Sequence, residues 1–175
     1  MSLDRLWSGW RADYVGSVGG GPGAGSVFTS ILASGLPDAE TFIVHRGVTC
    51  FVILNAYPYS TGHMLVLPYR EVADLEQLSD DESTELWATV TAAVAAVKRS
   101  HRPHALNVGI NLGASAGGSI SQHLHVHVVP RWEGDANFMT SVANTRTLPE
   151  PLGETHRRIT AAWNGPATAQ EGTGR

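Results

Sequence analysis

The sequence predicts an α+β fold in which an antiparallel sheet of about five strands carries one long helix and a short C-terminal helix. Five runs of β-branched, aromatic and aliphatic residues predict the strands. They lie at 41–44, 49–54, 63–67, 105–112 and 123–129. A capping box at 79–82, followed by apolar residues every three or four positions, predicts the long helix to about residue 100. We also expect 155–163 to be helical.

The connections between these elements carry their own signals. Turn residues at 45–47 predict a hairpin between the first two strands, and the turn-rich segment 55–62 predicts a loop. Pro68 closes a nearly continuous apolar run, which is typical of a buried strand. Pro103 ends the long helix, because proline cannot continue one.

One folded domain is expected over 26–163. Residues 17–25 are too rich in glycine and too poor in apolar surface to pack, so 1–25 is expected to form an N-terminal arm and linker. The last residues, 164–175, have a similar composition and are expected to form a disordered tail.

Composition excludes several classes of protein. The 12 Lys and Arg residues are scattered and the net charge is −4, which argues against a nucleic-acid partner. Cys50 is the single cysteine, so an internal disulfide and a cysteine-based zinc site are both excluded. No apolar run approaches the roughly 20 residues of a membrane span, and residues 1–15 lack the apolar core of a signal peptide. We therefore expect a cytoplasmic protein without a membrane partner.

Three histidines, His123, His125 and His127, alternate with aliphatic residues. They are called the triad histidines below, and we expect them to share one face of a strand because successive side chains point to opposite faces. Such a pattern allows a solvated polar face, a zinc site with three imidazoles, or nucleophilic catalysis at phosphorus. No Asp, Glu or Cys stands within ten residues upstream of His123 to support a metal. A neutral imidazole, with an ordinary pKa near 6.5, is a competent nucleophile at neutral pH.

The segment directly before the histidines favours a phosphate ligand. Residues 111–119 are rich in Gly and Ser. Gly117 and Gly118 allow the backbone to approach a ligand closely and to present successive N–H groups to phosphate oxygens. Ser119 can add a hydroxyl donor. The preferred interpretation is therefore attack of a histidine on the α-phosphate of a nucleotide.

Several segments together resemble the histidine triad (HIT) family of nucleotidyl hydrolases and transferases. The family motif His-φ-His-φ-His-φ-φ, with φ apolar, fits residues 123–129 at every position, and the likeness extends from residue 26 to about 139. GHMLVLPYR, NVGINLGASAGGS and QHLHVHVVPRW carry it. The resemblance implies a HIT-like fold, a small-molecule nucleotide as partner, a homodimer, and catalysis without a metal or other cofactor.

The resemblance also implies a role for individual residues. His125 matches the family nucleophile, while His123 and His127 would orient it and contact the phosphate. His63 matches a fourth histidine, and Asn55 matches a ribose-binding residue. The remaining expected nucleotide contacts are Asn111, Gly117, Gly118 and Ser119 around the phosphate, and Val27, Phe28 and Ile31 around the base.

Two departures from the common family pattern refine the expectation. Ser26 and Thr29 stand where many bacterial relatives have Cys-x-x-Cys, so their structural zinc should be absent. The Gly118-Ser119 pair, with His127 retained, is similar to a branch that cleaves diadenosine tetraphosphate (Ap4A) with phosphate, giving ADP and ATP. Candidate donors for that phosphate are Arg131, Ser115 and Ser119.

Other functions remain open at this point. A HIT-type hydrolase would give AMP from Ap4A or from nucleoside phosphoramidates, and a regulatory module would bind nucleotide with little turnover. The acceptor in the second step, phosphate or water, is not settled by the motif.

Overall fold

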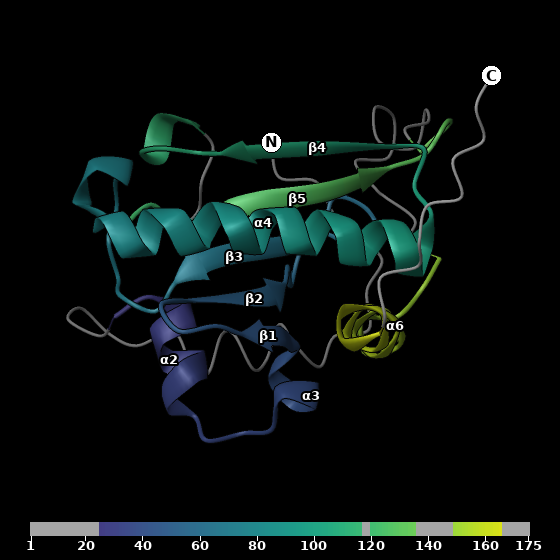
Figure 1. The fold of residues 1–175 in the computed structure, drawn as a ribbon, viewed down its shortest axis with the longest axis horizontal. Helices are drawn as coiled ribbons and strands as arrows, with labels where there is room; N and C mark the ends of the chain where they lie inside the picture. The colour runs from purple at the N-terminus through teal and green to yellow at the C-terminus, as the bar shows by residue number, and fades with distance from the viewer. Residues whose placement is uncertain (1–24, 117–119, 136–148, 166–175) are drawn as a thin grey trace.

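A computed structural model describes residues 25–116, 120–135 and 149–165, and within them the predicted α+β fold is confirmed (Figure 1). The five-stranded antiparallel sheet has the order β1-β2-β3-β5-β4. Its strands are β1 (Ile43–Arg46), β2 (Cys50–Leu54), β3 (Met64–Pro68), β4 (Ala105–Ile110) and β5 (Val126–Arg131). Nearly all of the expected arm and tail lies outside the described residues.

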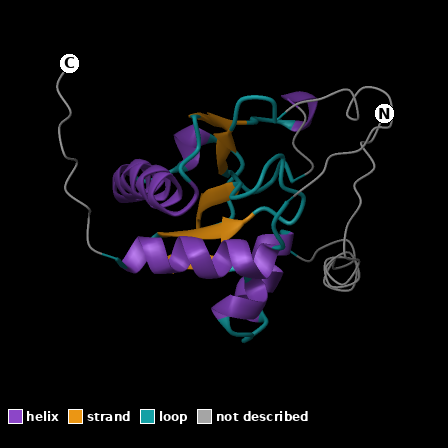
Figure 2. Cartoon of the chain, turned by 90° about the vertical axis from the view of Figure 1, so that its right-hand side faces the viewer, coloured by secondary structure: helices purple, strands orange, loops and turns teal. Residues whose placement is uncertain are grey.

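The helices form layers on both faces of the sheet. They are α2 (Val27–Ala33), α3 (Asp38–Thr41), α4 (Asp80–His101) and α6 (Leu152–Asn164), with short 3-10 turns η1 (Leu75–Gln77) and η2 (Ala114–Ala116). α4 lies across one face and contacts α6, and the two views show these helices crossing one another (Figures 1 and 2). Among the described helices, none is long and apolar enough to cross a membrane.

The sheet separates two apolar clusters because its side chains alternate between faces. On the α4 side, Val66, Val126 and Val128 pack with α4 and α6 in the larger cluster. On the other side, Phe28 and Ile31 of α2 pack against residues of β1, β2 and β3. The second cluster fixes α2 against the sheet, and α2 directly follows the predicted linker.

Helix α4 follows its sequence signals closely. Ser79 Oγ accepts from the Glu82 N–H at 3.2 Å, and the Glu82 carboxylate accepts from the Ser79 N–H at 2.8 Å, so the predicted capping box is confirmed. The helix stops where Arg102 adopts the left-handed conformation, with φ at 48°, just before Pro103. α6 begins three residues earlier than the predicted helix, at Leu152.

Three predicted strands differ from the observed ones by more than one residue at an end. The first strand begins at Ile43 because Asp38–Thr41 form α3 and Phe42 turns the chain with φ at 59°. The strand that begins at Ala105 ends at Ile110. The last strand is predicted at 123–129 but is β5, which continues through Pro130. Proline is tolerated there because pairing with β3 ends at Val128, so no backbone N–H of residue 130 is needed on that side.

Glu85 of α4 holds the β1–β2 turn. Its carboxylate accepts from the backbone N–H groups of Val48 and Thr49, both at 2.7 Å, and from the Thr49 hydroxyl at 2.5 Å. Gly47 leaves room for this contact, since a Cβ there would lie 2.1 Å from Glu85 Oε1. These hydrogen bonds link the β1–β2 hairpin to α4, which packs on the larger cluster.

We predict that Glu85→Ala destabilises the domain by about 1–3 kcal/mol, because it leaves turn donors without their charged acceptor. Urea denaturation measures the change as a lower midpoint with an unchanged slope. Thr84→Ala, at an exposed neighbouring position of α4, is the control and is expected to stay within about 0.5 kcal/mol of the parent. Equal midpoints for Glu85→Ala and the control would contradict the assignment.

Candidate active site

The triad histidines lie at the start of β5, on the sheet face away from α4. His123 and His125 precede the strand and His127 lies within it. Leu124 packs in the same cluster as Val126 and Val128, so the predicted alternation holds even where regular pairing has not begun. The exposed fractions of the three histidines are 0%, 7% and 9% in chain order. This burial excludes the solvated-face interpretation.

The hydrogen bonds of His125 fix which of its nitrogens can react. Nδ1 lies 2.7 Å from the carbonyl oxygen of His123. A carbonyl only accepts, so Nδ1 carries the proton and Nε2 of the neutral ring has a lone pair. Among the described residues, nothing hydrogen-bonds to that Nε2. His125 is therefore held as a nucleophile with its reactive nitrogen available.

His63 and His127 form a second ordered chain. Nδ1 of His63 accepts from the Tyr59 backbone N–H at 3.0 Å, so the proton of a neutral His63 is on Nε2. That Nε2 lies 2.9 Å from Nδ1 of His127, which must accept, leaving Nε2 of His127 as a donor. Asn111 lies 3.5 Å from this donor, and its amide oxygen can accept from it after a half-turn of the side chain.

His123 has a different environment from the one expected. Its Nε2 donates to the Pro68 carbonyl at 2.9 Å, and its Nδ1 accepts from the Ser26 hydroxyl at 2.6 Å. Both nitrogens are engaged inside the fold, so this geometry does not support the expected contact between the His123 ring and phosphate. The residue instead positions His125 through its own carbonyl group.

A polar cluster links His123 to α2. Ser26 caps this helix, and its backbone N–H donates to Glu71 at 2.7 Å. Thr29 donates to the same carboxylate oxygen at 2.9 Å. Ser26 and Thr29, which stand where many bacterial relatives have zinc-binding cysteines, thus both bind the Glu71 carboxylate, and Ser26 also binds His123. Within the described residues, no group of three or more His, Cys, Asp or Glu side chains could hold a metal ion.

Of the expected base-pocket residues, Phe28 lies beside the first two histidines. The Phe28 ring centroid is 5.5 Å from that of His123 and 5.6 Å from that of His125. Phe28 and Ile31 are buried in the smaller cluster, and Val27 is partly buried against it. They are therefore core residues, and Phe28 is also a wall of the site. Asn55 lies beside His63, where its Oδ1 accepts from the Tyr57 N–H at 2.9 Å.

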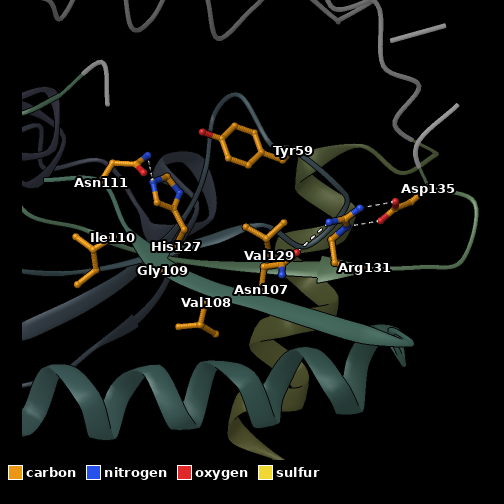
Figure 3. A pocket seen from close by; sticks show the side chains of 10 residues that line it. All are labelled: Tyr59, Asn107, Val108, Gly109, Ile110, Asn111, His127, Val129, Arg131 and Asp135. Atoms are coloured by element: carbon orange, nitrogen blue, oxygen red, sulfur yellow. Dashed lines mark hydrogen bonds and ion pairs between the residues drawn. The ribbon is translucent and has the colours of Figure 1, made fainter. Parts of the chain in front are cut away.

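A pocket of about 340 Å³ opens on the other side of His127, over the paired strands β4 and β5 (Figure 3). We call it the β4–β5 pocket. Its lining residues are Tyr59, Asn107, Val108, Gly109, Ile110, Asn111, His127, Val129, Arg131 and Asp135. Arg131 is fixed by two hydrogen bonds to Asp135, at 2.7 and 2.8 Å, and one to Asn107 at 2.9 Å.

Some predicted site residues cannot be compared with this geometry. Gly117, Gly118 and Ser119 lie outside the described residues. Conversely, sequence reasoning missed Ser26 as a partner of His123, Tyr59 as a partner of His63, and Gly109 as part of the pocket. Their roles follow from the tertiary fold, and no local pattern marks them.

Burial lowers the pKa of each triad histidine. For His127 desolvation, with a further effect of the neighbouring His125, lowers the pKa to about 4. For His123 and His125 desolvation lowers the pKa although hydrogen bonds to the Pro68 and His123 carbonyls oppose it. The three rings are therefore neutral at pH 7, as the tautomer assignment requires. Together they provide a neutral nucleophile next to a neutral N–H donor.

A family model described as the HIT domain matches residues 37–134. The chain therefore belongs to the HIT domain family. It is 44% identical over 167 residues to a Mycobacterium tuberculosis protein named AP-4-A phosphorylase, covering 92% of this chain and 85% of that one. It is also 32% identical over 93 residues to a Schizosaccharomyces pombe asymmetrical bis(5'-nucleosyl)-tetraphosphatase, covering 53% of this chain and 50% of the relative.

Solved structures of the family have the same fold. A histidine triad nucleotide-binding protein from Sulfolobus tokodaii matches with a TM-score of 0.64 and 29% identity, over 79% of this chain and 91% of that chain. A zinc-bound histidine triad family protein from Mycobacterium smegmatis matches with a TM-score of 0.63 and 27% identity, over 78% and 91%.

The neutral triad histidines predict a loss of stability in mild acid. Each has a folded-state pKa below the unfolded value of about 6.5. Below pH 6.5 the unfolded chain therefore binds more protons, and stability falls as pH decreases toward the folded-state pKa values. For His127, whose folded-state pKa is about 4, we expect a loss on the order of 1 kcal/mol between pH 6.5 and 5.5, and His123 and His125 contribute losses of the same sign.

Urea midpoints at pH 7.5, 6.5 and 5.5 measure this slope. Carboxylates interfere little there, because their ordinary pKa values of about 4 lie below this pH range. His127→Gln should reduce the dependence of the urea midpoint on pH by the His127 contribution. A stability that is flat from pH 7.5 to 5.5 would contradict the assignment of neutral, buried rings.

Proposed function

We propose that this protein is a nucleotidyltransferase that cleaves Ap4A with inorganic phosphate, giving ATP and ADP through an adenylyl group on His125. The single observation that carries the proposal is the His125 Nδ1–H bond to the His123 carbonyl, which leaves Nε2 as the free nucleophile. The relative named AP-4-A phosphorylase supports the substrate, since it is similar over most of both chains.

In the first displacement, Nε2 of His125 attacks the α-phosphorus of Ap4A. The Nε2–P bond forms, the bond from phosphorus to the bridging oxygen breaks, and ATP leaves with the electron pair. His127 donates its Nε2–H to the bridging oxygen as charge develops there. The developing positive charge on His125 is stabilised by the His123 carbonyl, which accepts its Nδ1–H at 2.7 Å.

In the second displacement, an oxygen of inorganic phosphate attacks the adenylyl phosphorus. The Nε2–P bond breaks, its electron pair returns to Nε2, and ADP is released with the free enzyme restored. The covalent route divides one difficult displacement into two easier ones. If water attacks instead, the product is AMP and the protein is a hydrolase.

The adenosine of the adenylyl group is assigned to the α2 side of the site. Phe28 lies beside His123 and His125, and Val27 precedes it on the same helix. Asn55 provides the candidate ribose contact next to His63, and Asn111 is a candidate contact to phosphate next to His127. Ser119, Gly117 and Gly118 remain predicted phosphate contacts.

We predict that Ap4A consumption depends on phosphate and yields ADP and ATP in equal amounts. Chromatography of products with and without phosphate measures this, and mass spectrometry of a quenched reaction detects adenylyl-His125. Activity that is independent of phosphate and yields AMP with ATP would instead identify the hydrolase. Tight binding without an intermediate or product would identify the regulatory module.

His125→Ala should abolish both the intermediate and turnover, a loss of at least about 10³-fold. His45→Gln is the matched control, because His45 lies on β1 and packs against Trp163 of α6, away from the triad. Turnover by His125→Ala at a rate close to that of the control would remove the mechanism itself.

We also propose that the protein is a homodimer joined through α4 and the edge of β4. β4 is the last strand of the sheet and, within the described chain, pairs only with β5. Trp87 of α4 is 47% exposed and Val108 of β4 is 44% exposed. An unpaired edge beside large exposed apolar side chains favours association with a second copy.

We predict that sedimentation velocity finds a dimer and that Trp87→Glu shifts it toward the monomer. The introduced carboxylate would be desolvated without a partner in the joined surface. Val48→Glu places the same charge at an 89% exposed position of the β1–β2 turn and should leave the dimer intact. A monomeric parent protein at micromolar concentration would contradict the proposal.

A further inference from the structure

We propose that the β4–β5 pocket binds phosphate groups on the leaving side of the α-phosphorus, with Gly109 as the residue that keeps it open and Arg131 as the cation that recognises them. The inference rests on the proposed function, because it assumes that His125 carries the nucleotidyl group. It assigns a site to the distal part of the substrate and to the incoming phosphate.

The two sides of the triad differ. Phe28 contacts the rings of His123 and His125, so the side toward α2 is walled by an aromatic residue. The opposite side, beyond His127, opens into the pocket. Attacking and leaving groups lie roughly in line across phosphorus. If the nucleoside lies near Phe28, the leaving phosphate chain therefore lies on the His127 side, where the Nε2–H group of His127 can donate to it.

Gly109 makes this space possible. It pairs directly with His127 across the β4–β5 ladder, so a side chain there would stand beside His127 on the same face. A Cβ built at Gly109 meets no atom within 4 Å. The backbone does not require glycine either, because its φ is outside the left-handed range. Because Gly109 has no side chain, the pocket is open next to the Nε2–H donor of His127. The strand geometry itself would accept a larger residue at this position.

Arg131 supplies the charge farther along the pocket. It stands four residues after His127 on the same face of β5, roughly 13 Å along the strand. Three of the five guanidinium N–H donors bind Asp135 and Asn107, which fix its plane. Two donors remain for a ligand, and among the described residues no other Lys or Arg lines the pocket. Asp135 offsets part of the charge, so a multiply charged phosphate chain suits the site better than a single weak anion.

Phosphate groups reach the β4–β5 pocket from two sources in the proposed reaction. The distal phosphates of Ap4A occupy the leaving side in the first displacement. Inorganic phosphate must approach from that side in the second, because both displacements pass through the same line at phosphorus. The first source is tested by adenylylation of His125, and the second by discharge of the adenylyl group.

Gly109→Val tests the pocket without disturbing the free protein. The added side chain enters open space and valine favours a strand, so the melting temperature should not fall. We expect the rate of His125 adenylylation by Ap4A to fall about 10- to 100-fold, as lost pocket volume and misplaced phosphates predict. Adenosine 5′-phosphoramidate, whose leaving group is ammonia, should react within about threefold of the parent rate.

Thr84→Val is the control, because Thr84 is exposed on α4 and lies outside the pocket. It should leave both rates unchanged. Equal losses with both substrates, or no loss with either, would overturn the role of Gly109. If the parent protein forms no adenylyl-His125 with either substrate, the proposed function itself has failed. Labelling of the parent by phosphoramidate separates the two outcomes.

Arg131→Gln separates the two phosphate sources. Slower adenylylation by Ap4A, by about tenfold, indicates contact with the leaving chain. A comparable slowing when phosphate discharges an adenylyl group loaded from phosphoramidate indicates contact with inorganic phosphate. Arg46→Gln removes an arginine bound to Asp38 with similar hydrogen bonds on β1, and should change neither rate. Unchanged rates in both steps for Arg131→Gln would overturn the role of Arg131.

Discussion

The carbonyl oxygen of His123 determines the chemistry of His125, because it accepts the Nδ1 proton and leaves Nε2 as the only basic nitrogen. That carbonyl is held in turn by the position of the His123 ring, which is anchored at both nitrogens to Pro68 and Ser26. A buried imidazole with both nitrogens bonded cannot rotate without losing a hydrogen bond. The nucleophile is therefore oriented by a neighbour that need not touch the substrate.

Proton positions in the second chain follow from one backbone donor. The Tyr59 N–H fixes the tautomer of His63, and His63 fixes that of His127. Desolvation keeps both His127 and the nucleophile His125 neutral, so the donor and the nucleophile coexist without repulsion between two cations. The donor and the nucleophile are thus fixed within a buried site, where the charge that develops in the reaction meets protein groups rather than water.

Local signals predicted the parts of the fold that local interactions stabilise. The capping box of Ser79 and Glu82 and the apolar period of α4 are contained in one helix, so the sequence reveals them. α2 and α3 were missed because they are short, and α2 is held by the burial of Phe28 and Ile31 rather than by a long periodic pattern.

The candidate site was predictable only in part, for the same physical reason. Three histidines at alternating positions identify the catalytic strand, although its regular pairing begins only at Val126. The pocket depends on the register that sets Gly109 opposite His127, and a single sequence does not reveal register between strands. The partner of His123 was likewise hidden, since it lies near the start of the domain.

Ser26 and His123 are separated by 97 positions along the chain. Contacts of such long range form late, because a large loop must close before the bond contributes. During synthesis α2 emerges long before the residue that it will anchor. The nucleophile therefore acquires its fixed tautomer only after most of the domain has been made, and a truncated chain ending before His123 would carry the nucleoside wall without any of the triad histidines.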